Sequence, residues 1–170
     1  MRPRIDDLRT IQQLALTYKW SLEFTKFPSG VATSIDSNFL NMMCETANIP
    51  KETPSIITIN QRGARVNYPG ITNASGNISL TFIETVDQSV MKFLTAWRKA
   101  CYDAKTGLSL TKGEVEAIIT LYLLDNQNSP TYKYKLVGCI LEDYTPSTLS
   151  NEADFMKPSI TVHYDYFEEA

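Results

Sequence analysis

The sequence predicts a mainly β fold with one packed α-helix, arranged as an antiparallel β-sandwich or barrel. Apolar and polar residues alternate along several segments, which is typical of strands with one buried and one solvent-facing side. One other segment spaces its apolar residues three and four positions apart, as an amphipathic helix does. The length of 170 residues favours a single domain, 1–170, with an N-terminal arm at 1–13 and an extended loop at 62–76.

Six strands are predicted. Three segments alternate strictly, and three more are rich in Ile, Thr, Tyr and Val. The alternating segments are 16–24, 77–82 and 159–167, and the others are 55–61, 114–124 and 132–141. The middle of the 115–124 segment is apolar on both faces, which indicates that it is covered on both sides or by a neighbouring subunit.

One clear helix is predicted after Asp87, whose side chain can act as the N-cap. Its apolar stripe consists of Val90, Phe93, Leu94, Trp97, Ala100, Cys101 and Ala104. The segment 105–107, Lys-Thr-Gly, predicts its end, because a basic residue followed by glycine is a common stop. A second, shorter helix is predicted at 5–14.

Two connections, 61–76 and 145–158, are longer than the two to six residues that usually join strands, so we expect both to act outside their own core. The charge is also uneven. Residues 140–170 hold seven acids and one base, a balance of −6, and since the whole chain carries −3, the rest carries +3. This split suits head-to-tail contact between copies, and two differently solvated faces are the alternative interpretation.

The residues that catalysis or metal binding needs do not come together in the sequence. The single histidine, His163, lies on the polar side of a strand, with no second histidine and no cysteine nearby in the sequence. Cys44, Cys101 and Cys139 are far apart, which favours reduced thiols. We therefore predict no enzyme activity, no cofactor and no metal. The lack of a long apolar run and of a signal peptide predicts a soluble protein made inside the cell.

Three short motifs follow one another along the chain. They are Cys44, Ala47 and Pro50 in a Cys-x-x-Ala-x-x-Pro segment, the helical pair Phe93 and Trp97, and the C-terminal group Tyr164, Tyr166, Phe167 and Glu168. In this order and at this length the chain resembles the tail tube protein of contractile-tailed (T4-like) bacteriophages. The resemblance covers about residues 14–169, and the N-terminal arm and the 62–76 and 145–158 loops depart from it.

The resemblance implies a structural virion protein with a β-sandwich or barrel of the phage tail-tube type. Homohexameric rings of such a viral tail protein stack into the inner tube of a contractile tail, and DNA passes through the lumen during viral genome ejection. The implied partners are further copies of the chain, the tail sheath, baseplate and tail terminator proteins, and the tape measure protein and genomic DNA in the lumen, with no membrane. The implied location is the virion (phage tail), assembled in the bacterial host cytoplasm.

Two other functions stay open. The first is the inner tube of a tailocin or of a type VI-like contractile injection system, whose subunit is similar and whose cargo differs. The second is a monomeric β-barrel that binds a small ligand in its interior. A tube subunit predicts rings, whereas a ligand-binding barrel predicts a monomer with a pocket.

Two sets of residues are expected to serve the tube. The expected lumen-facing residues are Ser79, Thr81, Thr161, His163 and Asp165, because their alternate neighbours turn to the core. A head-to-tail ring needs two different complementary patches on each subunit. The expected subunit contacts are Arg2, Arg4, Arg9, Arg62, Arg65, Tyr68, Glu168 and Glu169, with the basic arm facing the acidic 142–169 region.

Overall fold

The computed structural model describes residues 5–11, 13–31 and 35–170. The described elements, in chain order, are α1 (Ile5–Arg9), β1 (Trp20–Lys26), α2 (Ser37–Met43), β2 (Cys44–Ala47), β3 (Thr53–Gln61), β4 (Ala64–Asn73), β5 (Gly76–Phe82), α3 (Ser89–Cys101), α4 (Lys112–Val115), β6 (Ala117–Leu124), β7 (Pro130–Thr145), β8 (Ser159–Tyr164) and β9 (Tyr166–Glu169). The predicted fold class, mainly β with antiparallel pairing and one principal helix, is confirmed. None of the described helices is long and apolar enough to cross a membrane.

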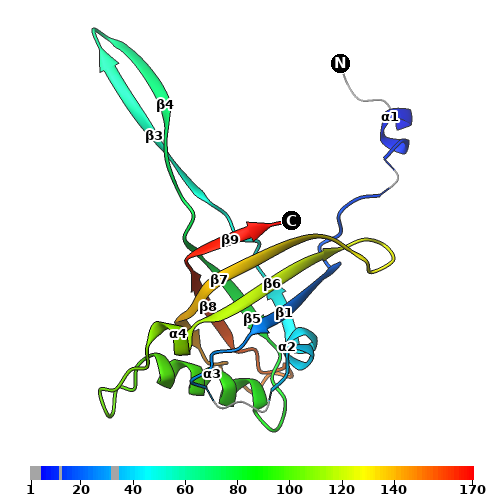
Figure 1. Cartoon of the computed structure of the whole chain (residues 1–170). Coiled ribbons are helices and arrows are strands. Elements are labelled where there is room, and N and C mark those ends of the chain that lie inside the picture. The colour runs from blue at the N-terminus through cyan, green and yellow to red at the C-terminus, as the bar shows by residue number, and fades with distance from the viewer. Residues whose placement is uncertain (1–4, 12, 32–34) are drawn as a thin grey trace.

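Seven strands form one antiparallel sheet that bends at β7 into two layers, called the sandwich below (Figure 1). The strand order is β1-β6-β7-β8-β5-β2, and β9 pairs with the first half of β7. The second half of β7 pairs with β8 instead. Gly138 lies between the two halves at φ 72°, a left-handed conformation that glycine adopts readily. One long strand therefore belongs to both layers.

The core lies between the layers and follows the alternation that the sequence shows. Every second side chain of β5 and β8 is buried, and the intervening ones are polar. The buried residues of these two strands are Ile78, Leu80, Phe82, Ile160, Val162 and Tyr164. The bounds of two predicted strands differ from the structure. The strand predicted at 16–24 begins only at Trp20, and the one predicted at 159–167 is divided into β8 and β9.

The helices α2, α3 and α4 lie together at one end of the sandwich, which is the lower end in Figure 1, whereas α1 lies apart from them near the N-terminus. α3 turns Val90, Phe93, Leu94 and Trp97 into the core, as the helical spacing predicts. The indole N–H of Trp97 donates a hydrogen bond of 2.8 Å to the carbonyl of Val115, which joins α3 to α4. This bond satisfies a polar group that would be costly to bury alone.

The start and end of α3 differ from the prediction. Asp87 is not the N-cap, because Gln88 holds that position in a left-handed conformation without a side-chain hydrogen bond. The carboxylate of Glu84 instead accepts hydrogen bonds from the backbone N–H groups of Val90 (3.2 Å) and Met91 (2.7 Å). The helix ends at Cys101, before the glycine stop that the sequence indicated. An acid outside the helix thus performs the capping.

The short helix α2 was not predicted, and it covers the outer edge of β1. The side-chain oxygen of Asn41 accepts a hydrogen bond of 2.8 Å from the N–H of Leu22, and the Ser37 hydroxyl accepts one of 2.7 Å from the N–H of Phe24. An edge strand with free N–H groups invites pairing with other chains. α2 therefore blocks the pairing of another chain with β1, which is one of the edge strands of the sheet.

Candidate assembly surfaces

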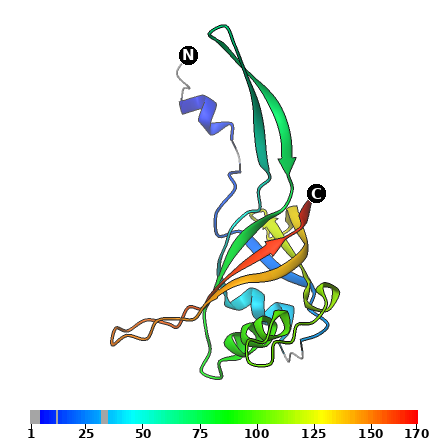
Figure 2. The same ribbon diagram turned by 90° about the vertical axis from the view of Figure 1, so that its left-hand side faces the viewer.

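The two strands β3 and β4 form a hairpin that leaves the sandwich and projects into solvent (Figures 1 and 2). The turn consists of Arg62 and Gly63, with φ of 48° and 82°, and joins Gln61 to its register partner Ala64. Positive φ at both turn residues is the signature of a type I′ turn, whose twist matches that of antiparallel strands. The predicted extended loop at 62–76 is therefore wrong for most of its length, since residues 64–73 form a paired strand.

Near its tip the hairpin has one apolar and one polar face, whereas closer to the base Ile56 and Pro69 add apolar side chains to the second face. Its register places Ile57 opposite Tyr68 and Ile59 opposite Val66, so these four side chains share a face, and each is about half exposed. The opposite face carries Thr58, Asn60, Arg65 and Asn67. A two-stranded hairpin on its own is only marginally stable in water. An apolar face of this kind indicates a surface that a partner covers.

Three of the predicted contact residues lie on this hairpin. Arg62 is in the turn, Arg65 is on the polar face next to it, and Tyr68 is on the apolar face. The sequence prediction named these three residues as contacts but did not name the isoleucines on β3 that complete the apolar face. The alternation of Ala64, Val66 and Tyr68 is the signal that identifies β4 as a strand, and Pro69 and Gly70 concealed it.

Four of the five predicted lumen-facing residues come together on the outer face of β5 and β8. Ser79 is the register partner of Thr161, while Thr81 and His163 lie next to them on the same face. This polar face extends onto β7, where the carboxylate of Glu142 lies 3.7 Å from Nδ1 of His163. The same carboxylate accepts a hydrogen bond of 3.2 Å from the amide of Asn77. The result is a continuous polar band over three strands.

Asp165 is set apart from this band. It lies between β8 and β9, and its carboxylate forms an ion pair with Lys112 at the start of α4. It packs against Gly138, where any added Cβ would meet the Asp165 carboxylate. Asp165 therefore stabilises the bend of the sheet. Its carboxylate pairs with Lys112 and lies against Gly138, where β7 passes from pairing with β9 to pairing with β8.

The remaining predicted contact residues lie at the two chain ends. Arg9 is exposed at the end of α1, while Arg2 and Arg4 lie outside the described residues. On β9, the Glu168 carboxylate pairs with Lys135 at 3.2 Å, and Glu169 accepts a 2.8 Å hydrogen bond from the Tyr132 hydroxyl. That hydrogen bond raises the pKa of Tyr132 above its ordinary value. Both acids of β9 thus already have partners inside the chain.

A second projection, residues 146–157, is named the acidic loop (Figure 2). Lys157, at its base, forms an ion pair of 3.0 Å with Glu45, and this hydrogen-bonded contact raises the pKa of Lys157. Further along, Glu152 and Asp154 are exposed, as are the apolar side chains of Leu149 (81%) and Phe155 (72%). The predicted long connection at 145–158 is confirmed as a loop, with a fixed base and an exposed outer part.

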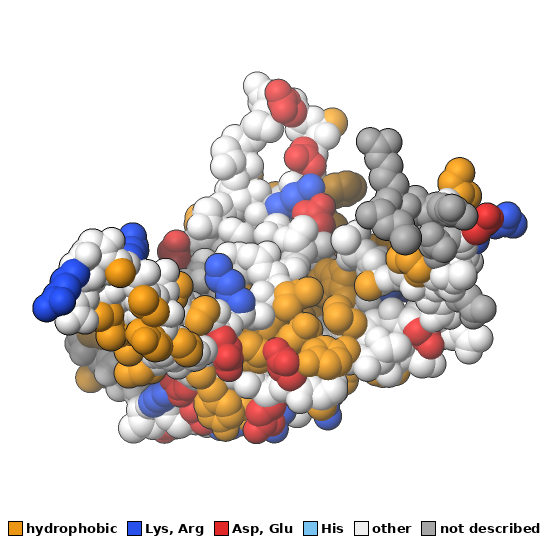
Figure 3. Space-filling model, turned by 90° about the horizontal axis from the view of Figure 1, so that it is seen from above, with side chains coloured by type: hydrophobic (Ala, Val, Ile, Leu, Met, Phe, Trp, Pro, Cys, Tyr) orange, Lys and Arg blue, Asp and Glu red, His pale blue; other side chains and the backbone are white. Residues whose placement is uncertain are grey.

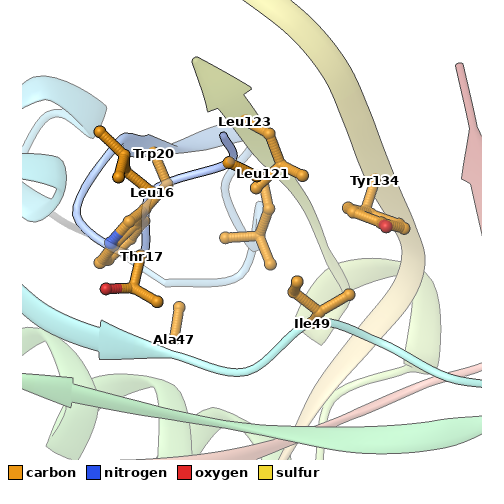
Figure 4. A pocket seen from close by; sticks show the side chains of 9 residues that line it. Leu16, Thr17, Trp20, Ala47, Ile49, Leu121, Leu123 and Tyr134 are labelled. Carbon is orange, nitrogen blue, oxygen red and sulfur yellow. The ribbon is translucent and has the colours of Figure 1, made fainter. Parts of the chain in front are cut away.

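The end of the sandwich opposite α3 and α4 contains an apolar cavity of about 300 Å³ between the two layers. Figure 4 shows Trp20, Leu121, Leu123 and Tyr134 from one layer facing Ile49 across this opening. Seen from above, hydrophobic side chains gather here and again on the hairpin (Figure 3). No charged side chain lines the cavity among the described residues, and the polar groups of its lining side chains are those of Thr17, Trp20 and Tyr134.

The cysteine thiols are poor nucleophiles. Burial raises the pKa of both Cys44 and Cys139 to about 12, and it raises that of Cys101 as well. All three are free thiols, as predicted, and such groups stay protonated near neutral pH. Within the described part of the chain, no three His, Cys, Asp or Glu side chains are placed to hold a metal ion.

The chain matches one protein-family model and several solved structures. The family model for phage tail tube proteins matches residues 13–136. A chain of the anti-feeding prophage cap, the tube-terminating cap, is 13% identical at a TM-score of 0.68, over 94% of this chain and 93% of that one. A chain of the PVC sheath–tube complex, an extracellular contractile injection system in the extended state, is 13% identical at a TM-score of 0.65, over 99% of both chains.

A further chain belongs to the sixfold-symmetrised baseplate of the anti-feeding prophage. It is 9% identical at a TM-score of 0.63, over 94% of this chain and 97% of that one. No curated protein sequence matches the chain. At these identities the likeness to solved structures shows a shared fold.

Proposed function

We propose that this chain, which belongs to the phage tail tube protein family, forms homohexameric rings that stack into the inner tube of a contractile particle. The matched residues 13–136 include the hairpin, α3 and the sandwich strands β1, β2, β5 and β6. The fold that it shares with a chain of a sheath–tube complex and with one of a sixfold baseplate supports this proposal.

The observation that carries the proposal is the exposed apolar face of the hairpin. Ile57, Ile59, Val66 and Tyr68 project from the sandwich on a ribbon whose extensive contacts, among the described elements, are those between β3 and β4. Fully burying an exposed apolar side chain contributes about 1.5–3 kcal/mol, so covering these half-exposed ones would contribute about half of that each. A second copy is the partner that a tube always supplies at this position.

Open strand edges supply a second kind of contact. Among the described residues, β9 pairs with β7 and β2 pairs with β5, and neither has a strand on its other side. Joining such edges from six subunits closes a barrel and removes edges that would otherwise aggregate. The sheets of neighbouring subunits would then form one continuous wall.

The polar band on β5, β8 and β7 is proposed as the lumen wall. It comprises Ser79, Thr81, Thr161 and His163 with the acids Glu142 and Asp143, and Asp165 lies at its border. Hydroxyl and carboxylate side chains suit an aqueous bore. If the cargo is DNA, an acidic wall repels phosphates, so the cargo slides without binding.

The proposed setting is a phage tail assembled in the bacterial cytoplasm. Sheath, baseplate and tail terminator proteins would surround the tube, and the tape measure protein and genomic DNA would occupy its lumen. The fold matches to injection particles support the alternative of a tailocin or type VI-like inner tube that delivers another cargo. Capsid and terminase genes beside the gene for this chain would indicate a phage, and an isolated tail cluster would indicate an injection particle.

A second candidate role, that of a tube terminator, is favoured by the fold shared with a tube-terminating cap. A terminator forms one ring that ends the tube, whereas a tube subunit stacks repeatedly. The two roles predict different assemblies from the same purified protein, single rings in one case and rods in the other.

Negative-stain microscopy and analytical ultracentrifugation of the purified chain test the proposal. We expect sixfold rings and rods built from them, with the hexamer as the smallest abundant assembly. Single rings at every concentration would favour the terminator role. A protein that stays monomeric at high concentration would contradict the tube and support the ligand-binding barrel.

A further inference from the structure

We infer that the basic tip of the hairpin in one copy docks on the acidic loop of the next copy along the tube. This inference rests on the proposed function and adds to it a specific pair of surfaces. The tip carries Arg62 and Arg65, and the outer part of the loop carries Glu152 and Asp154. Both surfaces also expose apolar side chains that a docked copy would bury.

The hairpin tip has a positive charge that forms no ion pair with an acid among the described residues. Arg62 and Arg65 are the two charged residues between Thr53 and Asn73, so the hairpin carries +2. The ion pairs among the described residues all involve other bases, namely Lys26, Lys112, Lys135, Lys157 and His163. The two guanidinium groups therefore remain available to carboxylates of another molecule, which they can bind through paired N–H groups.

The acidic loop is held at its base and free beyond it. The backbone N–H of Glu84 donates to the carbonyl of Met156 at 2.9 Å, and the N–H of Lys157 donates to the Ser147 hydroxyl at 3.0 Å. Because Glu45 already pairs with Lys157, the charge that remains on the loop is that of Glu152 and Asp154. The fixed base keeps the two exposed acids on a projection of the sandwich, where a basic partner can reach them.

The two projections leave the sandwich at opposite ends of the same strand. The hairpin joins β5 at Gly76, whereas the acidic loop begins and ends where Thr145 and Ser159 pair near the other end of β5. Figure 2 shows the hairpin rising from the upper end and the loop extending from the lower half. Surfaces at opposite ends are what head-to-tail stacking requires, because each copy then offers one to each neighbour.

The hairpin is also long enough to leave its own subunit. β4 has ten residues, which at about 3.3 Å per residue corresponds to about 33 Å. Its tip therefore stands well clear of the sandwich that supports it. Among the other exposed acids of the C-terminal region, Glu168 pairs with Lys135 and Glu142 contacts His163 within the chain. Asp143 belongs to the polar band that is proposed as the lumen wall.

Charge reversal tests the contact. The variants are R62E/R65E in the hairpin, E152K/D154K in the loop, and a chain carrying all four changes. A matched control, K92E/K105E, makes the same change in net charge as the hairpin variant, but on α3 and the turn after it. The readout is the lowest protein concentration at which tubes form, measured by sedimentation, with circular dichroism to check the fold.

Each two-site variant should raise this concentration about tenfold or more, because it brings like charges together at the contact. The four-site variant should return to within about threefold of the unaltered chain, because it restores opposite charges with their signs exchanged. The control should assemble like the unaltered chain. An equimolar mixture of the two two-site variants should assemble better than either alone.

Normal assembly of the two-site variants, or failure of the folded four-site variant to recover, would overturn the contact while leaving the tube proposal intact. If the unaltered chain formed no rings or tubes, the proposed function would fail and this contact with it. The two failures are thus separated by the behaviour of the unaltered chain.

Discussion

The sandwich and the hairpin treat the same residue type in opposite ways. Ile71, in β4, has 83% of its surface exposed, and Ile78, seven residues later in β5, has 1%. Both belong to alternating strands of one continuous stretch of chain. The sandwich thus satisfies its apolar side chains within the subunit, and the hairpin leaves its own for a partner. Folding and assembly are therefore expected to depend on different parts of the molecule.

The largest effect on folding is expected at Trp97, which is fully buried and contacts Phe93 and Phe24 at ring separations of 5.8 and 6.3 Å. Trp97→Ala should lower the free energy of unfolding by about 3–5 kcal/mol, because it leaves a cavity and an unpaired Val115 carbonyl. Urea denaturation measures the change. Phe155→Ala, on the exposed loop, is the control and should change stability by less than about 0.5 kcal/mol. Equal losses of unfolding free energy at Trp97 and Phe155 would contradict the separation between a folding core and an exposed surface.

A smaller effect is expected at the start of α3. Glu84→Gln should cost about 1–2 kcal/mol, because the Glu84 carboxylate accepts hydrogen bonds from two backbone N–H groups of the helix. Asp87→Asn, the change at the cap that the sequence suggested, should cost almost nothing. Thermal or urea unfolding of the two variants shows which acid caps α3. A larger loss of unfolding free energy in Asp87→Asn would assign the cap to Asp87.

Alkaline pH should weaken the sandwich through its buried thiols. The pKa of Cys139 is raised from its ordinary value of 9.0 to about 12 in the folded chain. Below the unfolded value both states hold the proton, and as the pH rises toward the folded value the unfolded chain loses it first, so stability falls. The free energy of unfolding should therefore decline between pH 9 and 12, and less steeply in Cys139→Ala. An identical slope in the variant would exclude this thiol as a cause.

The smallest effect on folding is expected on the hairpin. Tyr68→Ser should change the free energy of unfolding by less than about 0.5 kcal/mol, because the side chain is half exposed and lies outside the core. The same change should reduce tube formation, since it removes an aromatic side chain from the proposed contact face. Unfolding and sedimentation are measured on one preparation. Unchanged assembly would show that this face has no role in it.

The sequence predicted the sandwich well because its signals are local. Alternation along 77–82 and 159–167 identified β5 and β8 with their core residues, and helical spacing identified the buried face of α3. The three cysteines were also predicted to be reduced thiols, and all three are free. In each case, residues nearby in the sequence determine which side chains are buried.

What the sequence did not show depends on contacts between distant segments or on conflicting signals. The bend at Gly138 and Asp165 needs two strands that meet only in the folded chain, so alternation alone continued the polar face through Asp165. The cap of α3 comes from Glu84 across a loop, which no spacing rule anticipates. The hairpin was hidden because Pro69 and Gly70 suggested a loop within β4.

Removing the hairpin is the most direct test of the separation between folding and assembly. Thr53 and Asn73 are register partners, so residues 54–72 can be replaced by a two-residue Asn-Gly turn. The variant should unfold with a free energy within about 1 kcal/mol of the full chain, because the removed residues contribute no buried core side chain. Sedimentation and negative-stain microscopy should then show a folded protein that forms no stacked tubes. Normal tubes, or a chain that no longer folds, would contradict the account.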